Sequence, residues 1–233
     1  MTVKKNISAF TVVEVLIGFV VATIMLLALY SSYEVFSKSY ISIIDKINVN
    51  KALRISMATI VKDIRAAGYV DINSINYGKS FSALSFVNGG ATTADKIDII
   101  YENSSGERVI VKYFLLTDST GTYLGVTRRG CANETCTNFS GTGLFSFENE
   151  KLFKNIEDLQ FEFYDASGNK LSSPTSGVKY VQITLIYRSE NQINKAVQSK
   201  TFTSGDRTNL SFNDLYYRDI LTTSIYPRNL IKN

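Results

Sequence analysis

Hydrophobic residues are crowded into one block near the amino terminus, and elsewhere they are interspersed with polar residues. Within residues 10–33 the only charged side chain is Glu14. The continuous apolar part, residues 10–29, is about 20 residues long, and an α-helix of that length spans the roughly 30 Å hydrocarbon core of a bilayer. The pattern therefore predicts a helix that crosses a membrane once.

A short polar and basic segment precedes this block. Lys4 and Lys5 favour retention of that end in the cytoplasm, so the chain after residue 33 is expected on the far side of the membrane. A secretory signal peptide, which has the same basic start and apolar middle, is the main alternative. It fits less well because the block is long, no small-x-small cleavage site follows closely, and an acid lies in its first turns.

Glu14 is the most unusual residue of the apolar block. An isolated carboxylate inside a membrane costs about 2.5–3.5 kcal/mol on insertion scales, so Glu14 should have a partner or a function. If the chain were cut between Ala9 and Phe10, Glu14 would be the fifth residue. It would then lie one helical turn from a new ammonium group.

After residue 33 the pattern becomes one-sided. No proline or glycine occurs between Gly18 and Gly68, so one helix of about 55 residues, roughly 80 Å long, can continue to a left-handed cap at Gly68. Its second half, residues 34–68, is predicted to pack onto a domain through apolar side chains at helical spacing. These side chains are Ile43, Ile44, Ile47, Leu53, Met57, Ile60, Val61 and Ile64.

The remaining residues, 69–233, contain short runs of β-branched and aromatic residues separated by turn signals. These runs predict strands at residues 96–101, 108–116, 123–128, 159–164 and 180–187. In the last of them Val181, Ile183, Leu185 and Tyr187 alternate mostly with polar residues, which is typical of a half-buried strand. The sequence thus predicts an α+β fold, with a long helix lying across a mainly antiparallel sheet.

Residues 9–16, Ala-Phe-Thr-Val-Val-Glu-Val-Leu, resemble the class III signal of type IV prepilins and type II secretion pseudopilins. In that family a glycine is usually followed by F-T-L-x-E, and Ala9 stands here at the glycine position. The resemblance implies that a prepilin peptidase cuts between Ala9 and Phe10 and methylates the new amine of Phe10. It also implies that Glu14 pairs with the amine of a neighbouring subunit and sets the register of assembly.

Segments further along the chain are similar to PilW-type minor pilins. Residues 61–69, Val-Lys-Asp-Ile-Arg-Ala-Ala-Gly-Tyr, resemble the D-I-R-x-A-G-Y segment of that subtype, and residues 155–163 and 181–189 add further similarity. The ending at residues 225–230 is also similar to J-type pseudopilins of type II secretion.

These similarities imply a type IV pilin fold with four parts. They are a leader at residues 1–9, a transmembrane and filament-core helix at 10–33, the amphipathic second half of the helix at 34–68, and a β-rich pilin domain at 69–233.

The implied function is that of a minor pilin that helps to initiate or cap a type IV pilus, with a type II secretion pseudopilin as the second choice. The implied partners are other major and minor pilins, the prepilin peptidase, the inner-membrane assembly platform and membrane lipid. The chain would be a single-pass inner-membrane protein with a periplasmic domain before it joins the pilus at the cell surface. A signal-anchored surface binding protein that never polymerises is an alternative from a different class.

Cys131 and Cys136 lie in a polar segment, and the chain contains no other cysteine and no histidine that could complete a metal site. A local disulfide is the preferred interpretation, and it indicates an oxidising compartment such as the periplasm or cell surface. Two unpaired thiols remain the alternative.

The same lack of histidine removes Ser-His-Asp and Cys-His catalysis, so no enzyme activity and no metal or other cofactor are predicted. The carboxylate pair Glu157 and Asp158 is expected to be solvated rather than catalytic. The net charge of +4 includes Lys4 and Lys5, and the +2 that remains without them is too weak and dispersed to indicate a nucleic-acid partner.

Overall fold

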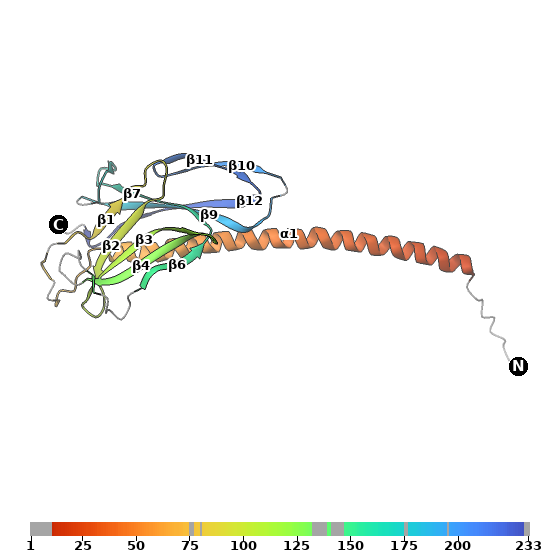
Figure 1. Ribbon diagram of the computed structural model, residues 1–233, viewed down its shortest axis with the longest axis horizontal. Coiled ribbons are helices and arrows are strands. Elements are labelled where there is room, and N and C mark those ends of the chain that lie inside the picture. Colours follow the sequence, from red (N-terminus) through yellow and green to blue (C-terminus); the bar gives the residue numbers. More distant parts are fainter. Residues whose placement is uncertain are drawn as a thin grey trace. The chain divides into compact units, whose positions relative to one another are not determined.

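The computed structural model describes residues 11–74, 77–79, 81–131, 139–140, 147–174, 177–194 and 196–230. The chain divides into two units, Met1–Ile44 and Asp45–Asn233. The first unit contains the amino-terminal part of the helix α1 (Val12–Ala66), and the second contains the rest of α1 together with all the described strands. The predicted α+β layout, one long amino-terminal helix and antiparallel sheets, is confirmed (Figure 1).

The end of α1 follows from its glycine. Gly68 has a φ of 75°, a left-handed conformation in which glycine is favoured, and the Tyr69 amide donates to the carbonyl of Ala66 at 2.9 Å. The Gly68 amide donates to the carbonyl of Ile100 at 2.9 Å. The predicted stop at Gly68 is therefore confirmed, and the same residue ties the end of the helix to a strand.

All strand pairings in the described residues are antiparallel, and they form three sheets. One sheet has the order β1-β2-β3-β4-β5, with β6 also pairing with β4; the second has the order β12-β9-β7-β8; and β10 pairs with β11. The first sheet comprises β1 (Leu84–Val87), β2 (Lys96–Glu102), β3 (Arg108–Asp118), β4 (Gly121–Cys131), β5 (Phe139–Ser140) and β6 (Phe147–Lys154). The other strands are β7 (Ile156–Tyr164), β8 (Lys170–Leu171), β9 (Tyr180–Gln192), β10 (Gln198–Ser204), β11 (Arg207–Asp214) and β12 (Tyr216–Ile225).

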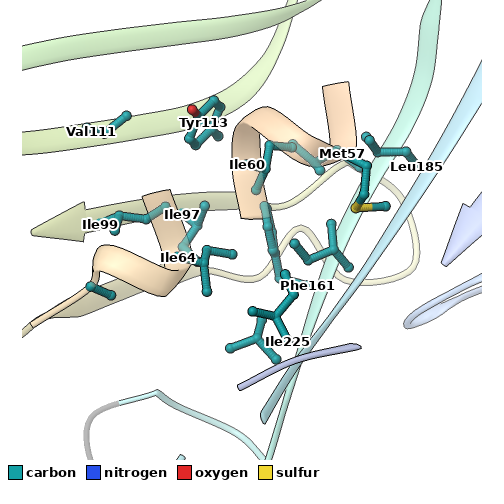
Figure 2. Close-up of a cluster of buried hydrophobic side chains, with 14 of the residues drawn as sticks. Met57, Ile60, Ile64, Ile97, Ile99, Val111, Tyr113, Phe161, Leu185 and Ile225 are labelled. Atoms are coloured by element: carbon teal, nitrogen blue, oxygen red, sulfur yellow. The ribbon is translucent and has the colours of Figure 1, made fainter. Parts of the chain in front are cut away.

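The core of the second unit forms where one face of α1 meets side chains from both larger sheets. The apolar residues of this helix face recur at steps of three and four, as expected for one side of a helix: Val49, Leu53, Met57, Ile60 and Ile64. Figure 2 shows Ile60 and Ile64 beside Ile97 from β2 and Phe161 from β7. Each fully buried side chain of this size contributes about 1.5–3 kcal/mol relative to exposure, so this face is the main attachment of the helix to the sheets.

The predicted packing face of α1 is only partly correct. Leu53, Met57, Ile60 and Ile64 are buried and Val61 is half-buried, whereas Ile43, Ile44 and Ile47 are 57%, 38% and 55% exposed. In that stretch the buried residues are Asp45 and Val49, which continue the four-residue row that leads to Leu53. Ile43, Ile44 and Ile47 lie on another side of the helix, and apolar spacing alone did not reveal which side would meet the sheets.

All five predicted strands are present, within β2, β3, β4, β7 and β9. The half-buried pattern expected for β9 is only partly confirmed, because Thr184 and Ile186 are buried along with Ile183 and Leu185. Consecutive residues at the centre of β9 are therefore buried on both faces, and the strand lies inside its sheet between β7 and β12.

Candidate functional site

The first turn of α1 is capped by the side chains of Thr11 and Glu14. Each of them accepts a hydrogen bond from the backbone amide of the other residue. Glu14 Oε2 accepts hydrogen bonds from the Thr11 amide at 2.8 Å and from the Thr11 hydroxyl at 3.0 Å. The Glu14 amide in turn donates to Thr11 Oγ1 at 3.3 Å. This is a capping box, in which two amides that no helical carbonyl can reach find side-chain acceptors.

The helix that follows fits a single membrane-spanning anchor. An 18-residue window of α1 has a mean hydropathy of 2.7, and none of that window is buried within the chain. Glu14 is itself exposed and lies among the exposed apolar side chains of Val12, Val13 and Val15. A carboxylate therefore stands in the first turn of a segment that is otherwise suited to lipid or to apolar helix surfaces.

No positive side chain on the same stretch of helix can neutralise Glu14. Residues 12–37 contain neither lysine nor arginine, and the first basic residue of α1 is Lys38. Both side-chain hydrogen bonds of Glu14 go to Thr11, which is uncharged. A compensating cation must therefore come from the chain before α1 or from another molecule.

The other residues predicted for processing and cross-linking are described only in part. Ala9 and Phe10 lie outside the described residues, so cleavage between them and methylation of Phe10 stay predictions. Cys131 is half-buried at the end of β4, where its backbone is paired with that of Phe139. Cys136 lies outside the described residues, so its disulfide with Cys131 also stays a prediction.

A buried polar cluster around Asp63 was not predicted from the sequence. The carboxylate of Asp63 accepts hydrogen bonds from the hydroxyls of Tyr101 at 3.0 Å and Tyr113 at 2.6 Å. Arg128 approaches the same carboxylate with its guanidinium at 3.1 Å and also donates to the Tyr101 hydroxyl at 2.8 Å. The cluster connects the last helical turns to β2, β3 and β4, and it positions the helix on the sheet.

Burial and the Asp63 charge keep both phenols of this cluster protonated. Burial first, and the nearby carboxylate second, raise the pKa of Tyr101 to about 12 and the pKa of Tyr113 still further. The phenols therefore remain hydrogen-bond donors at physiological pH. The sequence held one signal for this cluster, because Asp63 falls three residues after the buried Ile60, and residues three apart share a face of a helix.

The expectation that Glu157 and Asp158 are solvated is wrong. The side chain of Asp158 is fully buried and lies 2.6 Å from a guanidinium nitrogen of Arg207, while Glu157 lies 3.3 Å from both Arg188 and Arg218. The two carboxylates have different arginine partners and so belong to separate ion-pair groups. Both pairs join β7 to β9, β11 or β12, which is a structural role.

Asp95 is a buried acid whose ionisation opposes folding. Its carboxylate accepts the amides of Gly89 at 2.8 Å and Phe161 at 2.7 Å, which joins the loop before β2 to β7. Burial raises its pKa from 3.8 to about 6, although both amides act in the other direction. The folded state therefore binds the proton more tightly than the unfolded state, so the stability linked to Asp95 is complete below pH 4 and is lost as the pH rises through 6.

We expect the Asp95→Asn variant to reveal this effect. The unfolding free energy of the wild type minus that of the variant should fall by about 1–2 kcal/mol between pH 4 and pH 7, after allowance for solvent screening. Urea unfolding of the two purified proteins at matched pH values measures it. A difference that stays constant or rises over this range would contradict the prediction.

The described residues contain no group of three or more His, Cys, Asp or Glu side chains placed to hold a metal ion. No protein-family model matches this chain, and no curated protein matches it.

Proposed function

We propose that this chain is a minor subunit of a type IV pilus, held in the inner membrane by α1 before it joins the filament. The observation that carries the proposal is a lone carboxylate, Glu14, in the first turn of an exposed apolar helix that has no basic side chain before Lys38. A cation from a neighbouring molecule can compensate the charge of this carboxylate. The similarity of residues 9–16 to the prepilin signal suggests which cation this is, namely the amine of Phe10 in a neighbouring subunit.

The pairing of Glu14 with a neighbouring subunit's amine would set the register in which the helices of the filament pack. A buried acid is strongly unfavourable unless it is matched, so a subunit that is displaced along the helix bundle leaves an uncompensated charge. Both hydrogen bonds from Thr11 reach the same oxygen, Oε2, which leaves Oε1 as the oxygen that an amine can approach. The amine of the same chain, four residues before Glu14, is the competing partner.

The rest of the fold is compatible with a pilin. A helix packed on antiparallel sheets matches the layout implied by the prepilin-like signal, and the PilW-like segment at residues 61–69 contains Asp63, which fastens the helix to β2, β3 and β4. In this proposal the domain is periplasmic and then displayed on the pilus. Its partners are other pilins, the prepilin peptidase, the assembly platform and membrane lipid.

The start of the mature protein tests the assignment most directly. We expect mass spectrometry of the protein from its native cells to find an amino-terminal peptide that begins with N-methylated Phe10. In a strain without the prepilin peptidase, the leader at residues 1–9 should be retained. An intact leader in the unmodified strain, or a cut after the apolar block, would favour a signal-anchored or secreted binding protein instead.

The minor role makes a separate prediction about abundance. A mature chain of 224 residues (233 minus 9) is large for a subunit that packs repeatedly along a shaft, whereas a filament tip has no neighbours on one side. We expect this chain at well below one tenth of the main subunit in purified filaments, together with a fall in filament number in a deletion strain. Quantitative mass spectrometry and filament counts measure the two, and equal abundance or unchanged filament number would refute the initiation role.

A type II secretion pseudopilin is the second candidate, because residues 225–230 are similar to J-type pseudopilins. The same deletion strain distinguishes it, since loss of a pseudopilin blocks protein secretion and leaves surface pili in place.

A further inference from the structure

A hollow of about 300 Å³ lies within the unit Asp45–Asn233, where Lys46 of α1 meets β10 and β12. It is also lined by Asn194, Ser199, Lys200 and Tyr217. The volume is at the lower end of the range for small-molecule sites, and it suits one compact polar ligand. Two tyrosines, amide and hydroxyl groups, and three cationic side chains share this lining.

Two lysines of the hollow converge on one aromatic ring. The ammonium nitrogen of Lys46 lies 5.5 Å from the centroid of the Tyr217 ring, and that of Lys200 lies 5.7 Å from it. Lys200 Nζ also donates to the backbone carbonyl of Arg218 at 3.0 Å, which fixes its position. The ring and the carbonyl orient the two ammonium groups without neutralising them.

Neither lysine has a carboxylate partner in the part of the chain that the structure describes. Lysines that contact a carboxylate include Lys38, Lys112, Lys151, Lys154 and Lys170, and neither Lys46 nor Lys200 is among them. The hollow therefore brings together two ammonium groups whose charges the described chain leaves unpaired.

Three acids contact or neighbour the lining residues, and each has a partner of its own. Arg218 is held by Asp214 at 2.6 Å and 2.8 Å and by Glu157 at 3.3 Å, and Glu157 also contacts Arg188. Asp219 accepts a hydrogen bond from the Tyr217 hydroxyl at 3.4 Å. Since Asp214 and Glu157 compensate Arg218, the two lysines are the lining cations left for an incoming anion.

We propose that this hollow binds an acidic sugar, meaning a monosaccharide unit that carries a carboxylate or a phosphate. Lys46 and Lys200 would hold the anionic group as two point charges. The side-chain oxygen of Asn194 can accept a hydrogen bond from a sugar hydroxyl, and the Tyr217 ring offers apolar surface to the sugar ring. The two sources of such a ligand, a uronic acid and a sugar phosphate, share this chemistry and are separated by the experiment below.

The test uses the full chain in an uncharged polyoxyethylene detergent, because sugar-based detergents would compete. Saturation-transfer NMR titrations with glucuronate, glucose 6-phosphate, glucose and inorganic phosphate measure binding. We expect saturable binding of glucuronate or glucose 6-phosphate and at least about tenfold weaker binding of glucose, since neutral glucose gains nothing from the two charges. Preference for one acidic sugar over the other identifies the source.

Lysine variants test whether the acidic sugar binds in the hollow. Lys46→Gln and Lys200→Gln should each weaken the acidic sugar about fivefold, the effect of one charge pair at about 4 Å in water. Lys62→Gln, an exposed lysine on the same helix that does not line the hollow, is the matched control and should change nothing. Circular dichroism checks that each variant is folded.

Four results would overturn the proposal. These are no saturable binding of either acidic sugar, equal binding of glucose and glucuronate, binding of inorganic phosphate alone, and equal weakening by Lys62→Gln and the two hollow variants.

Discussion

Replacing Glu14 with alanine is expected to leave the chain in the inner membrane while lowering its amount in sheared filaments by about tenfold or more. Removal of an intramembrane carboxylate relieves an insertion cost of about 2.5–3.5 kcal/mol, so anchoring should not suffer. Incorporation should fail because the neighbour's amine would then be buried without a partner. Quantitative immunoblots of membrane and sheared-filament fractions measure both quantities.

Two further variants separate the pairing role of Glu14 from its capping role. Glu14→Gln keeps an oxygen for the Thr11 amide but removes the charge, so it should fail in filaments as Glu14→Ala does. Thr11→Ala removes the hydroxyl of the capping box, costing about 1 kcal/mol of helix stability, but keeps the charge, so it should enter filaments. Normal amounts of Glu14→Ala in sheared filaments would refute the register argument, and failure of Thr11→Ala alone would reassign the effect to the cap.

Replacing Asp63 with alanine should destabilise the domain by about 3 kcal/mol or more. The change leaves the hydroxyls of Tyr101 and Tyr113 without their acceptor and leaves Arg128 facing them without its carboxylate. Removal of one partner from a buried charged cluster typically costs about 3–5 kcal/mol, and the partial exposure of Arg128 places this case near the lower value. Chemical unfolding of the purified protein, followed by tyrosine circular dichroism, measures it.

A surface pair provides the control for Asp63. Asp98 lies 2.8 Å from Lys112 with both side chains about one-third exposed, and Asp98→Ala should cost less than about 1 kcal/mol. The double variant Asp63→Ala with Arg128→Met should lose less than the sum of the single losses, because the second change removes the unpaired charge left by the first. Equal costs for Asp63→Ala and Asp98→Ala would show that the buried cluster contributes no more than a surface pair.

The features predicted from sequence are those with a strong local signal. Three features can be recognised from short stretches of sequence, and all are present in the structure. They are the apolar block, the absence of helix breakers before Gly68, and five strands rich in β-branched residues. The strands β10 and β11 were missed because their outward residues are polar, with most positions exposed or half-buried, so hydrophobic alternation is faint. Such strands can be recognised only when the strand with which they pair is known.

The candidate site was predictable to the extent that its chemistry is local. Glu14 stood out because one charge in an apolar block needs no tertiary information to be noticed. The Thr11-x-x-Glu14 spacing is an equally local signal, since it matches a capping box. Asp63 and the two lysines of the hollow could not be assigned partners, since those partners come from strands between 17 and 171 residues away in the chain.

The way α1 is fastened also determines how the domain would respond to mechanical load. Its buried face extends from Asp45 through Ile64, and the Asp63 cluster and the Gly68 amide lie at its far end. A pull along the axis of this helix toward its amino terminus would load these contacts in shear, so that many side chains must slide together before any single one is released. A sideways pull would peel them one at a time. The domain should therefore withstand far more force along the helix axis than across it.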